Sequence, residues 1–308
     1  MPLSIFGFRA LWSPIFMVVV VGIIIGFFLL TTKYRHKFKN SEPLKIRQAV
    51  MFTVAMLLLY FTKGSPIDVL AHIMFTFHMV QMALLYLVIP PLLVASIPPW
   101  MWRAIIELPV INKMFKFFTK PLIALILFNG IFSFYHIPLV MDFVKMHVLI
   151  HAVYTVLLFI LAIFLWWPLL NQLDGQYRLH GLKKLAYLVG DAVLLTPACG
   201  LIIFAPAAMY GTYTDGAMWL KAMELCVPTA TLSTLPPTIT GPELFSNMPA
   251  VEDQQLGGVL MKVIQEIVLG TMLIIIFFEW FNREQKDADE ITREALEQHQ
   301  KRLEMNKL

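Results

Sequence analysis

The sequence has little charge and almost no cysteine, and both shortages restrict the class of protein. Only 14% of its 308 residues are charged, whereas soluble domains carry about 25%. Its two cysteines, Cys199 and Cys226, are too few for a disulfide framework or a cysteine-rich metal site. The phosphate-binding loop, the glycine-rich dinucleotide motif, the nucleophile elbow and the HExxH zinc motif are also missing. We therefore expect neither a soluble domain nor an enzyme.

Long apolar runs take up most of the chain instead. Hydrophobic residues make up 58% of it, and a helix needs about 20 consecutive ones to cross the hydrocarbon layer. Seven runs come near this length, which predicts an all-α, polytopic bundle over residues 1–281. Pro90-Pro91 and Pro98-Pro99 are expected to end or break the third span, because proline lacks a backbone N–H. The predicted spans are 11–32, 46–62, 69–94, 121–136, 147–167, 185–206 and 258–281.

The loops between these spans alternate in charge. The first, third and fifth are rich in lysine and arginine, the second and fourth carry almost no charge, and the long sixth is acidic. Cytoplasmic loops carry the excess positive charge in membrane proteins. This predicts an outer N-terminus and a cytoplasmic C-terminus in a cell membrane, and it explains the net charge of +4 without nucleic-acid binding. The highly charged tail 282–308 is expected to be a solvated helix.

Five of the eight histidines lie in or beside apolar runs, all near the predicted outer face. Ionisable residues are costly inside a membrane, so a one-sided group of them indicates a functional site. Helix bundles bind metals and cofactors with side chains from facing helices at one depth. The five are His72 and His78 on the third span, His136 at the end of the fourth, and His147 and His151 at the start of the fifth.

Helical spacing divides these histidines. Met74, His78 and Met82 recur every four residues and form one stripe. His147 and His151 also stand four apart, a spacing that lets two imidazoles hold one ion. Imidazole combined with thioether sulfur is a ligand set that favours copper.

The remaining candidates are weaker. His72 is expected on a face turned away from the His78 stripe, and is the weakest of the five histidines. A single interfacial histidine is more often hydrogen-bonded or snorkelling, and a methionine stripe is more often packing. The one-sided grouping nevertheless favours a metal or cofactor site.

Asp253 and Gln254 at the end of the sixth loop, together with Met79 and Met209, are candidates for the surroundings of that site. Asp253 is either the cap of the last span, followed by a glycine pair for close packing, or a carboxylate that orients a ligand histidine. We expect four residues to lie around the ligands rather than bind the ion themselves, and they are Asp253, Gln254, Met79 and Met209.

Several short motifs together resemble the CtaG family of cytochrome c oxidase assembly factors. They span roughly 71–258, and the seven-span layout agrees with the family across the chain. One departure concerns the third span, where the family often reads His-Met-x-Gln-His-Met and this chain has Met82-Ala83 as the last pair. The motifs are His78-Met79-Val80-Gln81 with Pro90-Pro91, Tyr135-His136-Ile137-Pro138 with His147 and His151, Phe204-Ala205-Pro206 with Met209-Tyr210, and 253–258.

The resemblance implies a role in maturing a haem-copper oxidase at its copper centres. Its histidines map to His78, His136, His147 and His151, and its partners would be oxidase subunits and a copper donor protein. Replacement of an imidazole by Met82 favours Cu(I), because thioether is a soft ligand. A haem protein with two axial histidines is the alternative. A transporter has less support, since the prolines lie at span ends and no internal repeat is evident.

Overall fold

The structure is a computed structural model that describes residues 1–173, 175–235 and 241–305. Within these ranges the chain forms helices and no strand. The α-helices are α1 Gly7–Trp12, α2 Pro14–Thr31, α3 Ile46–Lys63, α4 Pro66–Ile73, α5 Phe75–Ala83, α6 Ile89–Ser96, α7 Pro99–Ile106, α8 Pro109–Phe118, α9 Pro121–Tyr135, α10 Pro138–Lys145, α11 Val148–Leu170, α12 Leu182–Ile203, α13 Gly216–Met223, α14 Thr229–Leu232 and α15 Ala250–Met305. Five shorter elements are η1 Leu3–Phe6, η2 Arg35–Lys37, η3 Leu84–Val88, η4 Gly211–Tyr213 and η5 Pro242–Leu244.

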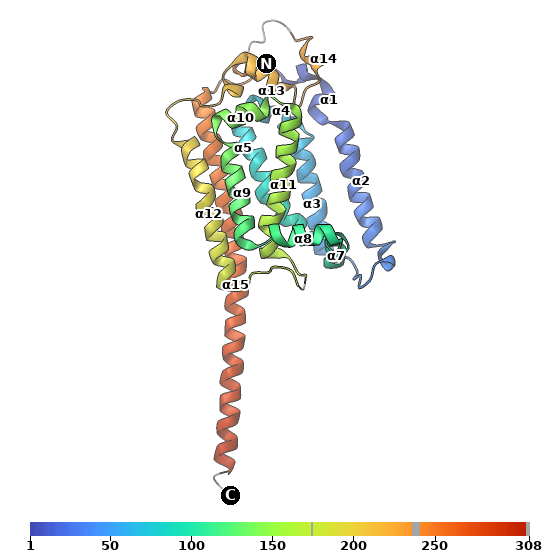
Figure 1. Ribbon diagram of the computed structural model, residues 1–308, viewed down its shortest axis with the longest axis vertical. Helices are drawn as coiled ribbons and strands as arrows, with labels where there is room; N and C mark the ends of the chain where they lie inside the picture. Colours follow the sequence, from blue (N-terminus) through green and yellow to red (C-terminus); the bar gives the residue numbers. More distant parts are fainter. Residues whose placement is uncertain (174, 236–240, 306–308) are drawn as a thin grey trace.

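The long helices run side by side as a bundle (Figure 1). Among the described residues, six helices are long and apolar enough to cross a membrane, or seven if the bent pair α8 and α9 counts as one span. The predicted all-α polytopic fold is therefore confirmed. Helices α5 and α6 form the middle of the bundle, where they pack against α15, α3 and α11, while α2 packs on α3 at the edge.

The third predicted span is not one helix. Met74 adopts an extended conformation (φ −122°, ψ 130°) that separates α4 from α5. Pro90-Pro91 does not end the span, because α6 includes both prolines. The carbonyl of Tyr86, which lies four residues before Pro90, accepts a hydrogen bond from Trp166 Nε1 (3.2 Å) instead of from a backbone N–H. Pro98-Pro99 does coincide with a helix end, since α6 stops at Ser96.

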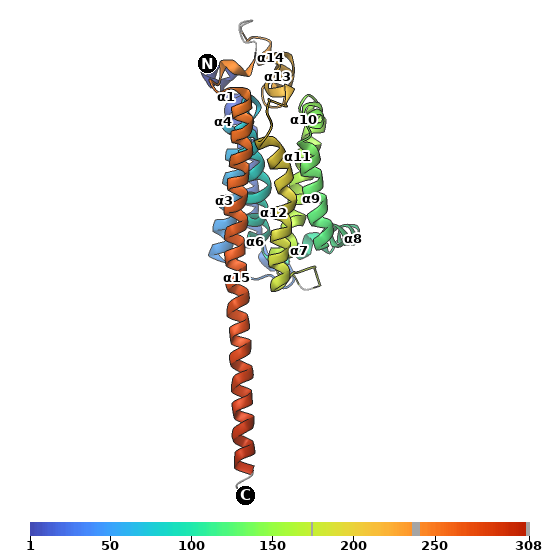
Figure 2. The ribbon, with the colours of Figure 1, turned by 90° about the vertical axis from the view of Figure 1, so that its left-hand side faces the viewer.

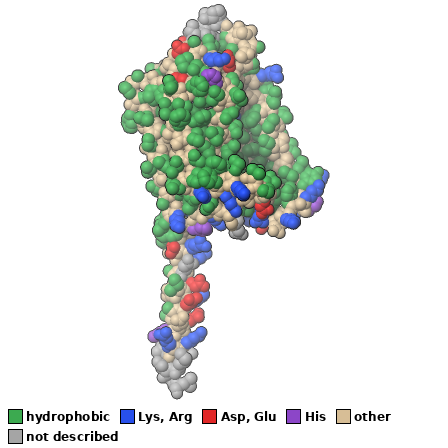
Figure 3. All heavy atoms as spheres, viewed as in Figure 1, with side chains coloured by type: hydrophobic (Ala, Val, Ile, Leu, Met, Phe, Trp, Pro, Cys, Tyr) green, Lys and Arg blue, Asp and Glu red, His purple; other side chains and the backbone are tan. Residues whose placement is uncertain are grey.

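The two ends of the bundle differ. Helices α7 and α8 lie across one end, and α8 joins α9 at a bend of 77°. Lysine and arginine side chains gather around this end on the face shown in Figure 3. The two chain ends lie at opposite ends of the molecule (Figure 1). The predicted membrane orientation remains a prediction, because these features do not tell which end faces the cytoplasm.

Helix α15 is 56 residues long and continues from the bundle into the charged tail without a break. Figures 1 and 2 show its second half projecting away from all other helices. The predicted tail helix is thus the extension of the last span. Its last three residues, 306–308, lie outside the described part of the chain.

Candidate functional site: a buried histidine cluster

The break between α4 and α5 positions His72 and His78. Ser65 starts α4 by accepting a hydrogen bond from the N–H of Ile67 (3.2 Å), and Pro66 follows in the first turn, where its missing N–H is not needed. At the start of α5, the first N–H groups donate to a residue from another helix, Asp253 of α15. This places His72 at the end of one helix and His78 at the start of the next.

His72 is buried, with 2% of its surface exposed. Its Nδ1 donates to the carbonyl of Asp68 (2.8 Å), and its ring centroid lies 6.0 Å from that of His151. The carboxylate of Asp68 in turn accepts hydrogen bonds from Lys63 (2.5 Å) and Gln81 (2.7 Å). The polar network thus holds Asp68, whose carbonyl orients the His72 ring, and that ring packs against His151 near the start of α11.

His78 and His136 form a second pair, with ring centroids 6.4 Å apart. His136 caps the end of α9, and its Nδ1 donates to the carbonyl of Phe132 (2.7 Å). The ring of Tyr135 lies 5.9 Å from His78 and 5.2 Å from His136. Both histidines are buried, so the pair is enclosed by aromatic rings.

Three imidazole nitrogens in this cluster have no partner. The Nε2 atoms of His72, His78 and His136 are buried without a hydrogen bond. Because carbonyls only accept, Nδ1 of His72 and of His136 must carry the proton, which leaves a free lone pair on Nε2. Burial lowers the pKa of His72 and lowers that of His136 to about 4, so both rings are neutral at pH 7. Neutral nitrogens of this kind are metal ligands.

His147 and His151 do not share a face in the way their spacing predicts. Helix α11 begins at Val148, so His147 is its N-cap residue and has extended backbone dihedrals (φ −123°, ψ 103°). Its side chain is exposed, its Nδ1 donates to the carbonyl of Phe143 (2.7 Å), and its ring packs on the ring of that residue (4.5 Å). His151 instead faces His72. The expectation that His72 points away from the site is wrong, because it assumed one continuous helix through Met74.

The predicted methionines occupy different surroundings. Met74 packs with a small apolar cluster around Phe6 and Trp219, whereas Met79 and Met82 belong to the main core. Met209 lines a largely apolar cavity of about 680 Å³ that His136 also lines. Met209 is thus the predicted methionine that shares a cavity wall with a predicted histidine.

Lys145 and Tyr213 form one wall of the cluster, and sequence reasoning missed both. Lys145 has no exposed surface, donates to the hydroxyl of Tyr213 (2.5 Å), and lies 4.2 Å from the centroid of that ring. The hydroxyl donates to the carbonyl of Ala71 (2.7 Å), and the ring lies 6.2 Å from that of His78. The only signal in the sequence is a lone basic residue in segment 138–146, where Asp142 is the other charged residue.

Asp253 holds the helix break rather than a histidine ring. Its two carboxylate oxygens accept hydrogen bonds from the N–H groups of Phe75 (2.6 Å) and Thr76 (3.1 Å). Gly257, one turn later, allows this approach, since a Cβ there would lie 2.8 Å from a ring carbon of Phe75. Gln254 bonds to the backbone N–H of Met209 (2.8 Å) and ties that segment to α15.

Two pairs of histidine rings in the cluster have centroids about 6 Å apart. Two imidazoles on opposite sides of one ion have centroids about 6 Å apart, given a metal–nitrogen distance of about 2 Å. The pairs His72–His151 and His78–His136 have this spacing. Within the described ranges, no group of three or more His, Cys, Asp or Glu side chains converges on a common point that could hold an ion. An ion at these rings would therefore be held by one pair of imidazoles rather than by three or more such ligands.

Comparison with known proteins identifies the family. The family model described as cytochrome c oxidase caa3 assembly factor (Caa3_CtaG) matches residues 25–283, which include every residue of the cluster. Comparison with curated proteins and with solved structures gave no match. The match confirms the resemblance seen in the motifs, and with the apolar helices it indicates a multi-pass protein of a bacterial membrane. The chain belongs to the family of cytochrome c oxidase caa3 assembly factors.

Proposed function

We propose that this assembly factor binds Cu(I) as cargo at the buried histidine cluster and supports metallation of a haem-copper oxidase. The observation that carries the proposal is the set of three buried, unpartnered Nε2 atoms on His72, His78 and His136. Buried polar atoms normally have partners, so an unpartnered group of this kind needs an explanation. A bound ion would supply the missing partner.

The choice of Cu(I) rests on the kind and number of donors. Each pair offers two neutral imidazoles, and Met209 adds a thioether on the wall beside His136. Soft or low-coordinate sites favour Cu(I), whereas structural zinc takes four ligands. Ligation by only two rings also suits cargo, because an ion that is passed on must not be held too tightly. Oxidase subunits and a copper donor protein are the partners this role requires.

Haem is the second candidate, and the packing around the cluster disfavours it. A haem between His78 and His136 would have to displace the ring of Tyr135, which lies within 6 Å of both. Tyr135 is itself only 1% exposed. An absorption spectrum of the purified protein separates the two candidates, since haem gives a Soret band and Cu(I) does not.

Metal analysis of the purified full chain tests the proposal. The variant His72→Ala/His78→Ala removes one ring from each pair, and we expect it to lose the copper that the wild-type protein retains. His147→Ala is the matched control, because His147 is exposed and contacts Phe143 instead of another histidine. Equal copper content in the double variant and the wild type would overturn the proposal. Oxidase activity of membranes from cells carrying each variant gives the second readout.

A further inference from the structure

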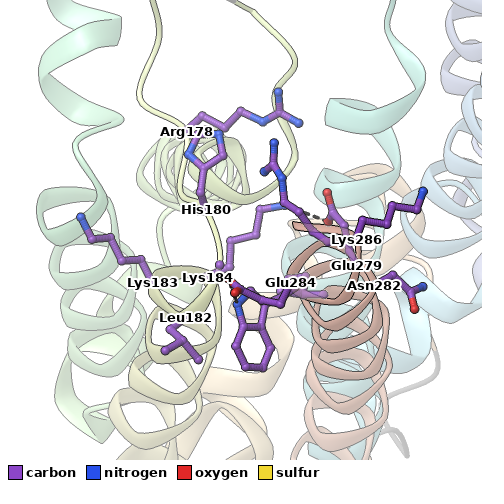
Figure 4. A pocket seen from close by; sticks show the side chains of 13 residues that line it. Arg178, His180, Leu182, Lys183, Lys184, Glu279, Asn282, Glu284 and Lys286 are labelled. Carbon is purple, nitrogen blue, oxygen red and sulfur yellow. Dashed lines mark hydrogen bonds and ion pairs between the residues drawn. The ribbon is translucent and has the colours of Figure 1, made fainter. Parts of the chain in front are cut away.

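A second pocket lies at the other end of the bundle from the histidine cluster. It has a volume of about 990 Å³ and is formed by the loop before α12 and by α15 at the end of its apolar part. Figure 4 shows Arg178 and His180 of the loop on one side and Glu279 and Lys286 of α15 on the other. Five cationic side chains line it, namely Arg178, Lys183, Lys184, Arg283 and Lys286.

Most of this positive charge is not neutralised within the protein. Two carboxylates line the pocket, and each already has a partner: Glu279 pairs with Lys184 (3.1 Å), and Glu284 accepts from the indole N–H of Trp280 (3.1 Å). Among the residues that the structure describes, no ion pair involves any of the other four cations. The pocket therefore attracts an anion.

The pocket also has an apolar side and lies between the first turn of α12 and the part of α15 where the apolar sequence gives way to the charged tail. Leu182 and Ile276 line it, and Leu182 is the first residue of the span formed by α12. Trp280 is typical of the membrane–water interface. Gly181 has a φ of +51° and lies against the indole ring of Trp280. A Cβ atom at this position would be 3.4 Å from that ring. Cationic and apolar surfaces thus meet at the level of lipid headgroups.

We propose that this pocket binds the phosphate of an anionic phospholipid. The arginine and lysine side chains would hold the phosphate, as basic pockets between membrane helices do, and the apolar wall would contact the start of an acyl chain. A free phosphate offers the same charge but nothing for Leu182 and Ile276 to contact, and for this reason we assign the pocket to a lipid.

Lipid titration of the purified, delipidated full chain, followed by native mass spectrometry, tests the assignment. The probes are phosphatidylglycerol, zwitterionic phosphatidylcholine and inorganic phosphate. The test variant is Arg178→Gln/Arg283→Gln, because neither arginine has an ion-pair partner in the described ranges. Its matched control is Lys113→Gln/Lys116→Gln, which removes two exposed charges from α8 at the same end of the bundle.

We expect phosphatidylglycerol to bind the wild type and the control with equal affinity. The test variant should bind it about thirtyfold more weakly, because each of the two lost basic residues contributes about 1 kcal/mol of binding free energy. Equal weakening in both variants would show general attraction to the basic end and overturn the proposal. Displacement of the lipid by inorganic phosphate would also overturn it, as would equal affinity for phosphatidylcholine. Copper content should not change in either variant, which separates this test from that of the histidine cluster.

Discussion

Replacing Asp253 with alanine tests how the histidine cluster is held in place. Its carboxylate accepts two backbone hydrogen bonds at the start of α5 in a buried setting. A hydrogen bond to a charged group contributes about 1.5–3 kcal/mol, and loss of a helix cap costs about 0.5–2 kcal/mol. We expect Asp253→Ala to lower the free energy of unfolding by about 3 kcal/mol. In a thermal scan of the detergent-purified protein this corresponds to a decrease of about 5 °C.

The neighbouring residue provides a control for this measurement. Glu252 is exposed on the same turn of α15, so Glu252→Gln should leave the unfolding temperature unchanged. Asp253→Asn keeps one acceptor oxygen and is expected to fall between the wild type and the alanine variant. An Asp253→Ala protein that unfolds at the wild-type temperature would refute the claim that α15 caps α5. Because the cap holds the start of the helix that carries His78, we expect copper content to fall together with stability.

Three further outcomes follow from the packing. Gly257→Ala should destabilise the protein by about 1–3 kcal/mol, measured by thermal unfolding, because its Cβ would lie 3.1 Å from the carbonyl oxygen of Phe75. Burial lowers the pKa of Lys145 to about 7. The unfolded chain therefore binds the lysine proton more tightly than the folded protein does. The free energy of unfolding should for this reason rise between pH 7 and pH 10.5. Lys145→Met should abolish that rise in unfolding scans across the same pH range. Trp166→Phe should cost about 1–3 kcal/mol in a thermal scan, because the Tyr86 carbonyl loses its donor; an unchanged melting temperature would show that another donor replaces the indole.

The membrane fold could be predicted from the sequence because it depends on local composition. Apolar runs of sufficient length become spanning helices whatever surrounds them, and seven predicted runs correspond to the six or seven spans observed. The α4–α5 break could not be predicted in the same way. It depends on Asp253, which is 178 residues away from Phe75 in the sequence. The residues around Met74 show no local pattern that predicts the contact between Asp253 and Phe75.

The candidate site was predictable only in outline for the same reason. The depth of the histidines follows from the span positions, but their facing depends on where each helix begins. Helix α11, for example, begins at Val148. His147 therefore lies just outside the helix and does not follow the helical periodicity that includes His151. The break at Met74 has the opposite effect and brings His72 into the cluster. Lys145 could not be predicted as part of the site, because a single basic residue in a short connecting segment has no distinctive spacing.

The continuity of α15 gives the molecule a mechanical link between its two ends. At 1.5 Å per residue, its 56 residues make a rod about 84 Å long, nearly three times the thickness of the hydrocarbon layer, which is about 30 Å. Asp253 lies in its first turn, and the projecting tail is its last half. The charged tail and the carboxylate that caps α5 therefore belong to one continuous helix, which connects the projecting end of the chain to the start of the helix that carries His78.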